Sequence, residues 1–144
     1  MHLLKPQTFM NDSGRALSGL APAEPGGPLD DLLVLVDEVA LPVGSFRIRA
    51  HGSAGGHNGL TSVETTIRTR HYARLRIGVG HKPADVDDLA DHVLERMPEA
   101  DRRAVDELMP TLCEAVECWM TEGVERAMSR FNRRVHDEPE PPRI

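Results

Sequence analysis

The hydrophobic positions of this chain follow two kinds of pattern. The continuous apolar run 32–36 is typical of a strand buried on both faces. Alternating apolar positions in Phe46–Ile48 and Ala73–Val79 predict two further strands. Between them, Leu60, Val63 and Ile67 repeat at the spacing of one helix face. Strands alternating with helices predict an α/β fold, here a three-layer α/β/α sandwich around a mixed, partly parallel sheet.

The two ends of the chain carry further local signals. Leu3–Lys5 reads as the end of a strand, and Asn11–Ser13 offers capping side chains to a short helix at 15–20. The last third is helical in pattern, with a kink or a helix start expected near Pro110. We therefore expect one domain at residues 1–134, followed by a polar, proline-rich and disordered tail at 135–144.

Charge is unevenly distributed along the 144 residues, whose formal net charge is −6. Residues 45–82 carry seven basic side chains and one acid, whereas residues 85–107 carry nine acids and three arginines. A negative net charge argues against nucleic-acid binding, but a local positive surplus is the footprint of a polyanion contact. The alternative is a set of solvated arginines beside an acidic neighbour.

Several classes of protein are disfavoured by composition. No apolar run approaches the roughly 20 residues that a membrane span needs, and no signal peptide follows Met1. Cys113 and Cys118 lie five residues apart in a helical pattern, so they point to different faces and a mutual disulfide is not expected. These features favour a cytoplasmic protein without a membrane partner.

Polar side chains at the ends of the predicted elements are the candidates for chemistry. The segment Gly55–Leu60 places His57 and Asn58 between a flexible double glycine and a helix. The simpler interpretation is that Asn58 only caps that helix and His57 is solvated. Asn11 and Asp37 also lie at element ends, where ligand sites of α/β sheets collect. Carboxamides, a carboxylate and a basic strip together suggest hydrolysis of a polyanionic ester or amide.

Read together, these motifs resemble the bacterial peptidyl-tRNA hydrolase (aminoacyl-tRNA hydrolase) family. The match runs from about residue 2 to residue 132, in the family's order and with similar spacing. The stretches that carry it are Lys5–Gly14, Val36–Pro42, Gly55–Leu60, Arg74–His81 and Trp119–Gly123.

The resemblance implies a monomer that cleaves the ester between a stalled peptide and its tRNA, and so releases free tRNA for translation. No metal or cofactor is implied, and His51, His71 and His81 lack the paired spacing of a metal site. It also implies roles for particular residues: Met10, Asn11, His57 and Asn58 bind the substrate, Asp37 orients the catalytic histidine, and Arg47, Arg49 and Arg76 contact the tRNA.

The printed sequence departs from the family pattern at its start. The family begins with a strand and an Arg-His-Asn motif whose histidine is the general base, and the 144 residues contain no such motif. We therefore expect an N-terminally truncated fold. His57 is not a substitute base, because its context matches the later motif of the family.

Three hypotheses follow from these observations. The first is a peptidyl-tRNA hydrolase whose printed sequence lacks the segment with the catalytic histidine. The second is an inactive RNA-binding relative that keeps the basic strip. The third is an α/β module that binds a phosphorylated small molecule, which is disfavoured because no GxGxxG or P-loop spacing occurs.

Overall fold

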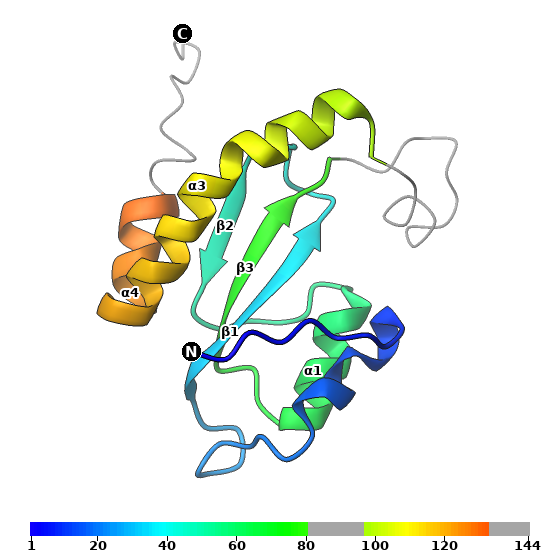
Figure 1. Ribbon diagram of the computed structural model, residues 1–144. Coiled ribbons are helices and arrows are strands. Elements are labelled where there is room, and N and C mark those ends of the chain that lie inside the picture. The colour runs from blue at the N-terminus through cyan, green and yellow to red at the C-terminus, as the bar shows by residue number, and fades with distance from the viewer. Residues whose placement is uncertain (81–96, 133–144) are drawn as a thin grey trace, which may run out of the picture. The chain divides into compact units, whose positions relative to one another are not determined.

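The computed structural model describes residues 1–80 and 97–132 (Figure 1). In chain order the elements are η1 (Met10–Leu17), β1 (Leu29–Glu38), β2 (Phe46–Arg49), α1 (Asn58–Ile67), β3 (Tyr72–Gly78), α3 (Glu99–Glu122), α4 (Val124–Ala127) and η2 (Met128–Asn132). The chain divides into two compact units. The first consists of Met1–Val36 and Arg49–Arg74, and the second of Asp37–Ile48 and Leu75–Ile144.

The three strands form one sheet in the order β1-β3-β2. In Figure 1 the arrows of β1 and β3 point the same way and that of β2 points the opposite way, so the sheet is mixed. The central strand, β3, has neighbours on both sides, and five of its seven residues are buried. The predicted α/β class and mixed sheet are confirmed.

The core of the first unit forms around α1. Leu60, Val63 and Ile67, the predicted helix face, are buried and pack with Tyr72 of β3. Partly buried side chains surround this cluster: Leu17, Leu29, Leu32, Val34, Val36 and Ala54. A fully buried Leu or Ile stabilises a fold by about 1.5–3 kcal/mol, so this one face accounts for the position of α1.

The core of the second unit joins β2 to the C-terminal helices. Phe46 is fully buried, and its ring lies 6.4 Å from that of Phe131 in η2. The Asn132 carboxamide accepts the N–H of Ile48 at 2.8 Å and donates to the carbonyl of Ile48 at 2.9 Å. This reciprocal pair ties the end of η2 to β2. Pro110 lies inside α3, which begins at Glu99, so no helix starts near Pro110.

Three local expectations are wrong. Leu3–Lys5 is not a strand, and Leu3 is 83% exposed. Leu35 in β1 is 50% exposed, so the described residues do not cover the face of β1 that carries it. Asn11–Ser13 does not cap a helix at 15–20, since it lies inside η1, whose N-cap is Phe9.

Two further sequence predictions concern membrane spans and the C-terminal tail. Within residues 1–80 and 97–132, no helix is long and apolar enough to cross a membrane. The predicted tail at 135–144 lies outside the described residues, so its disorder stays a prediction.

Candidate active site

The start of α1 is built by two glycines and a histidine. Gly55 and Gly56 have φ values of 61° and 82°, a left-handed backbone that other residues adopt only at a cost. The next residue, His57, is the N-cap of α1, and its Nδ1 accepts the N–H of Leu60 at 3.2 Å. His57 therefore satisfies one of the free N–H groups of the helix start.

This arrangement corrects the simpler interpretation of the motif. The cap is His57 and not Asn58, which is the first residue of α1 and is exposed. Among the described residues, the Asn58 carboxamide makes no hydrogen bond. An Nδ1 that accepts a hydrogen bond assigns the proton of the neutral ring to Nε2. The role of His57 in the reaction stays a prediction.

Gly14 brings η1 into direct contact with α1. Its backbone N–H donates to Oγ of Ser62 at 2.9 Å. A Cβ built at Gly14 would overlap the backbone carbonyl of Ser62 and the hydroxyl of Thr66. Only a glycine therefore permits this separation of the two helices.

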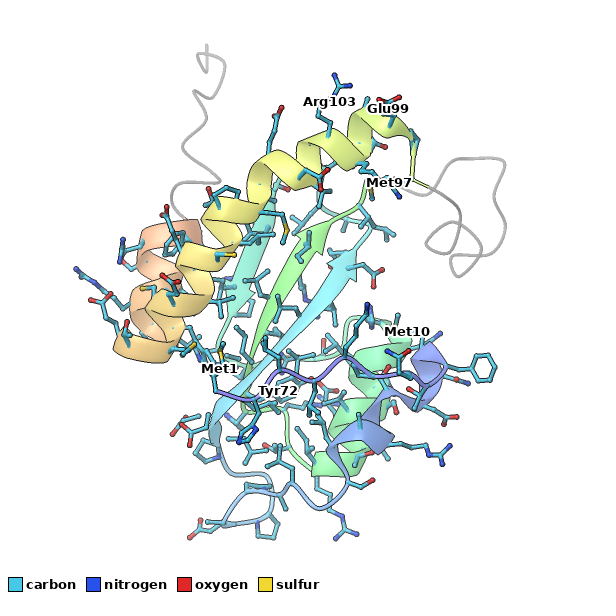
Figure 2. The ribbon with its side chains drawn as sticks, viewed as in Figure 1. Met1, Met10, Tyr72, Met97, Glu99 and Arg103 are labelled. Atoms are coloured by element: carbon cyan, nitrogen blue, oxygen red, sulfur yellow. The ribbon has the colours of Figure 1, made fainter. Side chains whose placement is uncertain are left out.

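A second close approach involves Gly59 in the first turn of α1. A Cβ built on Gly59 would lie 2.8 Å from Sδ of Met10 and 2.9 Å from Cε1 of His57. Met10 thus lies where η1 meets the start of α1, as Figure 2 also shows. The structure brings together the four residues predicted to bind substrate: Met10, Asn11, His57 and Asn58.

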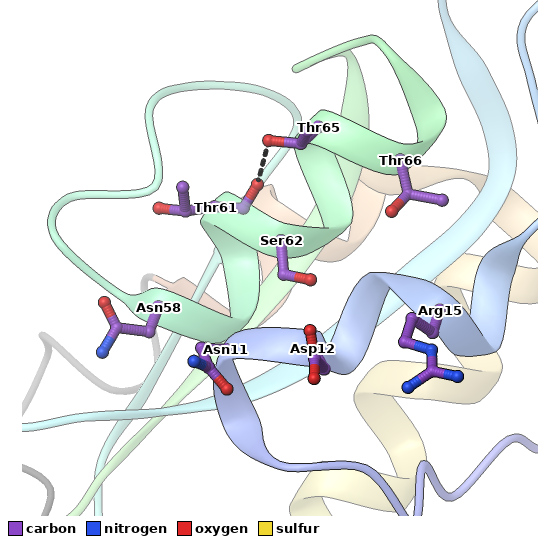
Figure 3. A pocket seen from close by; sticks show the side chains of 8 residues that line it. All are labelled: Asn11, Asp12, Arg15, Asn58, Thr61, Ser62, Thr65 and Thr66. Atoms are coloured by element: carbon purple, nitrogen blue, oxygen red, sulfur yellow. Dashed lines mark hydrogen bonds between the residues drawn. The ribbon is translucent and has the colours of Figure 1, made fainter.

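A polar hollow of about 400 Å³ runs between the two helices (Figure 3). Asn11 and Asn58 lie at one end of it, each in the first turn of its helix. The rest of the lining is hydroxyls and one opposite pair of charges, from Asp12, Arg15, Thr61, Ser62, Thr65 and Thr66. Neither carboxamide is hydrogen-bonded to another of the described residues, so both can serve a ligand. Amide N–H groups can bind a carbonyl oxygen and the oxyanion that forms from it.

Asp37 belongs to the second unit, at the end of β1. It is partly buried and interacts with other groups of the protein. Its neighbour Glu38 forms an ion pair with Arg76, with Oε1 and Nη1 3.4 Å apart. The carbonyl of Glu38 also accepts the N–H of Val79 at 3.1 Å. The end of the strand that carries Asp37 is therefore fixed by main-chain and side-chain bonds.

The predicted tRNA-binding arginines differ in exposure. Arg47 and Arg49 alternate along β2 with the buried Phe46 and Ile48, so they point to the opposite face of the strand. Arg49 is exposed and Arg47 is partly exposed. Arg76, by contrast, is 12% exposed and carries the ion pair with Glu38.

One arginine of the basic segment is structural. Arg74 is 1% exposed, and its guanidinium pairs with Glu64 at 3.1 Å and donates to the carbonyl of Arg70 at 2.7 Å. Its Cζ also lies 4.1 Å from the centre of the Tyr72 ring. The alternation in the sequence could not separate this buried cation from the exposed ones. Arg74 is therefore not available to a polyanion at the surface, and the positive charge of the basic segment at the surface is smaller by one.

The residues described offer no evident place for a metal. Within 1–80 and 97–132, no three His, Cys, Asp or Glu side chains gather closely enough to hold an ion. Both cysteines are free thiols, with Cys113 exposed and Cys118 buried. Burial, followed by the hydrogen bond to Glu122, raises the pKa of the Cys118 thiol above its usual value.

Comparison with known proteins identifies relatives along almost the whole chain. The family model described as peptidyl-tRNA hydrolase matches residues 1–139. A peptidyl-tRNA hydrolase of Gemmatimonas aurantiaca is 48% identical over 135 residues, which cover 91% of this chain and 70% of the relative. One from Lachnospira eligens is 41% identical over 130 residues, or 90% of this chain and 69% of the relative.

Solved structures agree with these relatives. The crystal structure of peptidyl-tRNA hydrolase from Acinetobacter baumannii superposes with a TM-score of 0.71 at 27% identity. The match covers 88% of this chain but 63% of that one, so the chain spans less than two thirds of the solved protein's length. These findings confirm the predicted resemblance and give no support to an inactive relative. The chain belongs to the peptidyl-tRNA hydrolase family.

Proposed function

We propose that this protein hydrolyses the ester bond between a peptide and tRNA and releases free tRNA. The observation that carries the proposal is the pair of carboxamides, Asn11 and Asn58, at one end of a polar hollow between η1 and α1. Family membership supplies the substrate class. The peptidyl end of the tRNA occupies the hollow, and the two carboxamides hold the scissile ester and the adjacent peptide backbone.

The chemistry assigned to the hollow is electrostatic. When water adds to the ester carbonyl, negative charge develops on the carbonyl oxygen, and N–H donors already in place stabilise it without reorganisation. We propose that the exposed side-chain amides of Asn11 and Asn58 become such donors when the bound ester orders them. We propose that the imidazole of His57, whose Nδ1 accepts the N–H of Leu60, also contacts the substrate, with Met10 packed beside it. The leaving group is the ribose hydroxyl of the terminal nucleotide, which takes up a proton.

Water activation requires a base that accepts its proton. The family resemblance assigns this role to the histidine of an Arg-His-Asn motif, and the 144 residues contain no such motif. Asp37 is proposed to accept a hydrogen bond from the second ring nitrogen of that histidine. A carboxylate in this role fixes the tautomer and stabilises the imidazolium that forms.

The body of the tRNA is proposed to contact Arg47, Arg49 and Arg76. Phosphate contacts of this kind determine affinity and salt dependence but not the chemical step. Exposure favours Arg49 as the strongest contact and Arg76 as the weakest, because Arg76 is already paired with Glu38.

We further propose that residues 1–134 form the hydrolase domain and that the protein acts as a monomer. We also propose that it acts in the cytoplasm, where free thiols such as Cys113 and Cys118 stay reduced.

The experiment that tests the proposal is single-turnover cleavage of a peptidyl-tRNA by the chain supplied with the family's histidine-bearing segment. Replacing Asn11 or Asn58 with Ala should slow cleavage by about 100-fold, the usual loss when one oxyanion donor is removed. An unchanged rate in both variants would mean that the hollow is not the reaction site.

A further inference from the structure

A second hollow, of about 490 Å³, lies at the C-terminal end of α1. Most of its lining comes from the last turns of the helix and the turn that follows, together with Gly26: Thr61, Glu64, Thr65, Arg68, Thr69, Arg70 and His71. Two arginines, a histidine and three hydroxyls thus face one space, and Glu64 is its sole carboxylate.

The charge of this hollow is positive because Glu64 is already engaged. Its Oε1 lies 3.1 Å from the buried guanidinium of Arg74 and 3.2 Å from the hydroxyl of Tyr72. Arg68 and Arg70 are exposed, and neither guanidinium pairs with another of the described residues. Two unpaired cations therefore remain for a ligand. Glu24, Asp30 and Asp31, which flank Gly26 in the sequence, do not line the hollow.

The turn that carries these cations is held rigidly. The hydroxyl of Thr69 donates to the carbonyl of Gly27 at 2.6 Å and accepts the N–H of His71 at 3.0 Å. The carbonyl of His71 accepts the N–H of Leu29 at 2.8 Å. Arg68 closes α1 with φ at 58°, a left-handed conformation that glycine would adopt without strain. These bonds fix the backbone from which the exposed side chains of Arg68 and Arg70 extend.

The two hollows lie along the same helix. Thr61 and Thr65 line both of them, so a ligand that leaves the first hollow along α1 enters the second. The ten residues of α1 rise about 15 Å from Asn58 to Ile67. One strand of a DNA duplex rises about 3.4 Å per nucleotide, and at that spacing this length corresponds to roughly four nucleotides.

From these observations we propose that Arg68 and Arg70 bind backbone phosphates of the single-stranded RNA that carries the ester, about four nucleotides from it. This inference rests on the proposed function, since the ester in the first hollow sets the register. The ligand chemistry is a phosphodiester, recognised by two charge-assisted guanidinium contacts. The hydroxyls of Thr65 and Thr69 already donate to the carbonyls of Thr61 and Gly27, so the guanidinium groups carry the recognition.

The test uses a double variant, Arg68→Gly with Arg70→Ala. Glycine suits the left-handed backbone at position 68, so this variant removes two charges without straining the turn, and its Tm should not fall. The control variant, Arg103→Ala with Arg126→Ala, removes two exposed arginines that pair with Glu99 and Glu122 elsewhere in the chain. Binding of deacylated tRNA is measured by fluorescence anisotropy from 50 to 300 mM salt.

The double variant should bind tRNA at least tenfold more weakly at low salt, and its salt slope should fall by roughly 1.4 to 1.8, the value for two phosphates. The control should lose much less of both. With RNA oligonucleotides about five nucleotides long, the wild type should bind more tightly than the double variant. With oligonucleotides about two nucleotides long, the two proteins should bind with equal affinity. Equal losses in the double variant and the control would overturn the site, because they would reflect net charge alone.

Two further results separate this proposal from its competitors. Inorganic phosphate that binds the wild type through Arg68 and Arg70, while tRNA binding is unchanged in the double variant, would assign the hollow to a free anion and overturn the RNA contact. If Arg47→Ala with Arg49→Ala weakens tRNA binding but Arg68→Gly with Arg70→Ala does not, then Arg68 and Arg70 do not contact the RNA. The proposed function would stand in that case. A wild-type chain that does not bind tRNA at all would fail the proposed function as well.

Discussion

The backbone N–H of Gly14 donates to Oγ of Ser62 at 2.9 Å, and this bond fixes η1 against α1 at a distance that no other residue at position 14 would allow. The consequence reaches the candidate site, because Asn11 lies on η1 and Asn58 on α1. The separation of the two carboxamides depends on a glycine that touches neither.

Replacing Gly14 with Ala should therefore separate the helices and impair the site. The added methyl group would overlap the carbonyl of Ser62, and overpacking of this kind costs about 1–3 kcal/mol. We expect a lower Tm and, in the form supplied with the catalytic histidine, a fall in kcat that exceeds the loss of folded protein. Thermal unfolding and single-turnover cleavage measured on one preparation check both effects.

The matched control for this variant is Gly19→Ala. Gly19 has φ at 91° with no atom within 4 Å of a built Cβ, so alanine strains the backbone without displacing η1 from α1. It should lower Tm but leave the rate per folded molecule unchanged. An equal loss of rate in the two variants would show that stability, and not helix separation, determines the activity.

His57 serves two functions that substitutions can separate. Removing the imidazole with His57→Ala deletes the cap of α1 and should destabilise the protein by about 1 kcal/mol. His57→Asn restores a capping side chain but not the Nε2–H donor. Stability should therefore recover in His57→Asn while cleavage stays slow. Recovery of the rate together with stability would mean that His57 acts through the cap alone.

Asp37 is expected to matter for the reaction and not for folding. In the form that carries the catalytic histidine, Asp37→Asn should slow cleavage by about a hundredfold or more, because the amide cannot stabilise an imidazolium. Tm should change little. Glu38→Gln is the neighbouring control, since it weakens the pair with Arg76 without touching the proposed orienting carboxylate. Turnover of Asp37→Asn within twofold of the parent would remove support for the orienting role.

The arginines of β2 should act on binding alone. Replacing Arg47 and Arg49 with Ala is expected to weaken tRNA binding and to reduce the salt slope by about two phosphate contacts. Cleavage of a minimal substrate that lacks the tRNA body should stay within twofold of the parent. An unchanged slope would place the docking face elsewhere on the protein.

Much of the fold could be predicted from sequence because the periodicity was strong. The spacing of Leu60, Val63 and Ile67 identified α1, and the alternation around Leu75 identified β3. The exposure of Leu35 on one face of β1 could not be predicted. An apolar run has the same composition whether one or both faces of the strand are covered. The first strand was predicted wrongly because Leu3–Lys5 is too short for its pattern to exclude a coil.

The candidate site was predictable as a set of residues but not as a geometry. The motifs selected Met10, Asn11, His57 and Asn58, and the structure places them together. The simpler interpretation, in which Asn58 caps α1, is wrong. His57 and Asn58 are both capable of capping a helix, and only the backbone decides between them. The burial of Arg74 depends on contacts with Glu64 and Tyr72, which a strand alternation does not encode. The roles of all the predicted site residues, with Asp37 and the exposed arginines among them, remain predictions.

The central claim is that the carboxamides of this chain hold a peptidyl-tRNA ester while the histidine of the family's Arg-His-Asn motif, once supplied, activates water. The most direct measurement compares three proteins in single-turnover cleavage of peptidyl-tRNA. They are the chain itself, the chain joined behind a family segment with the Arg-His-Asn motif, and that fusion with the motif histidine changed to Ala.

Each protein is first shown to unfold cooperatively and to bind tRNA, so that the rates compare folded molecules. The account predicts rapid cleavage by the fusion and rates at least 100-fold lower for the other two, because both lack the general base. Cleavage by the 144-residue chain at the rate of the fusion would contradict the account and would place the base among its own residues.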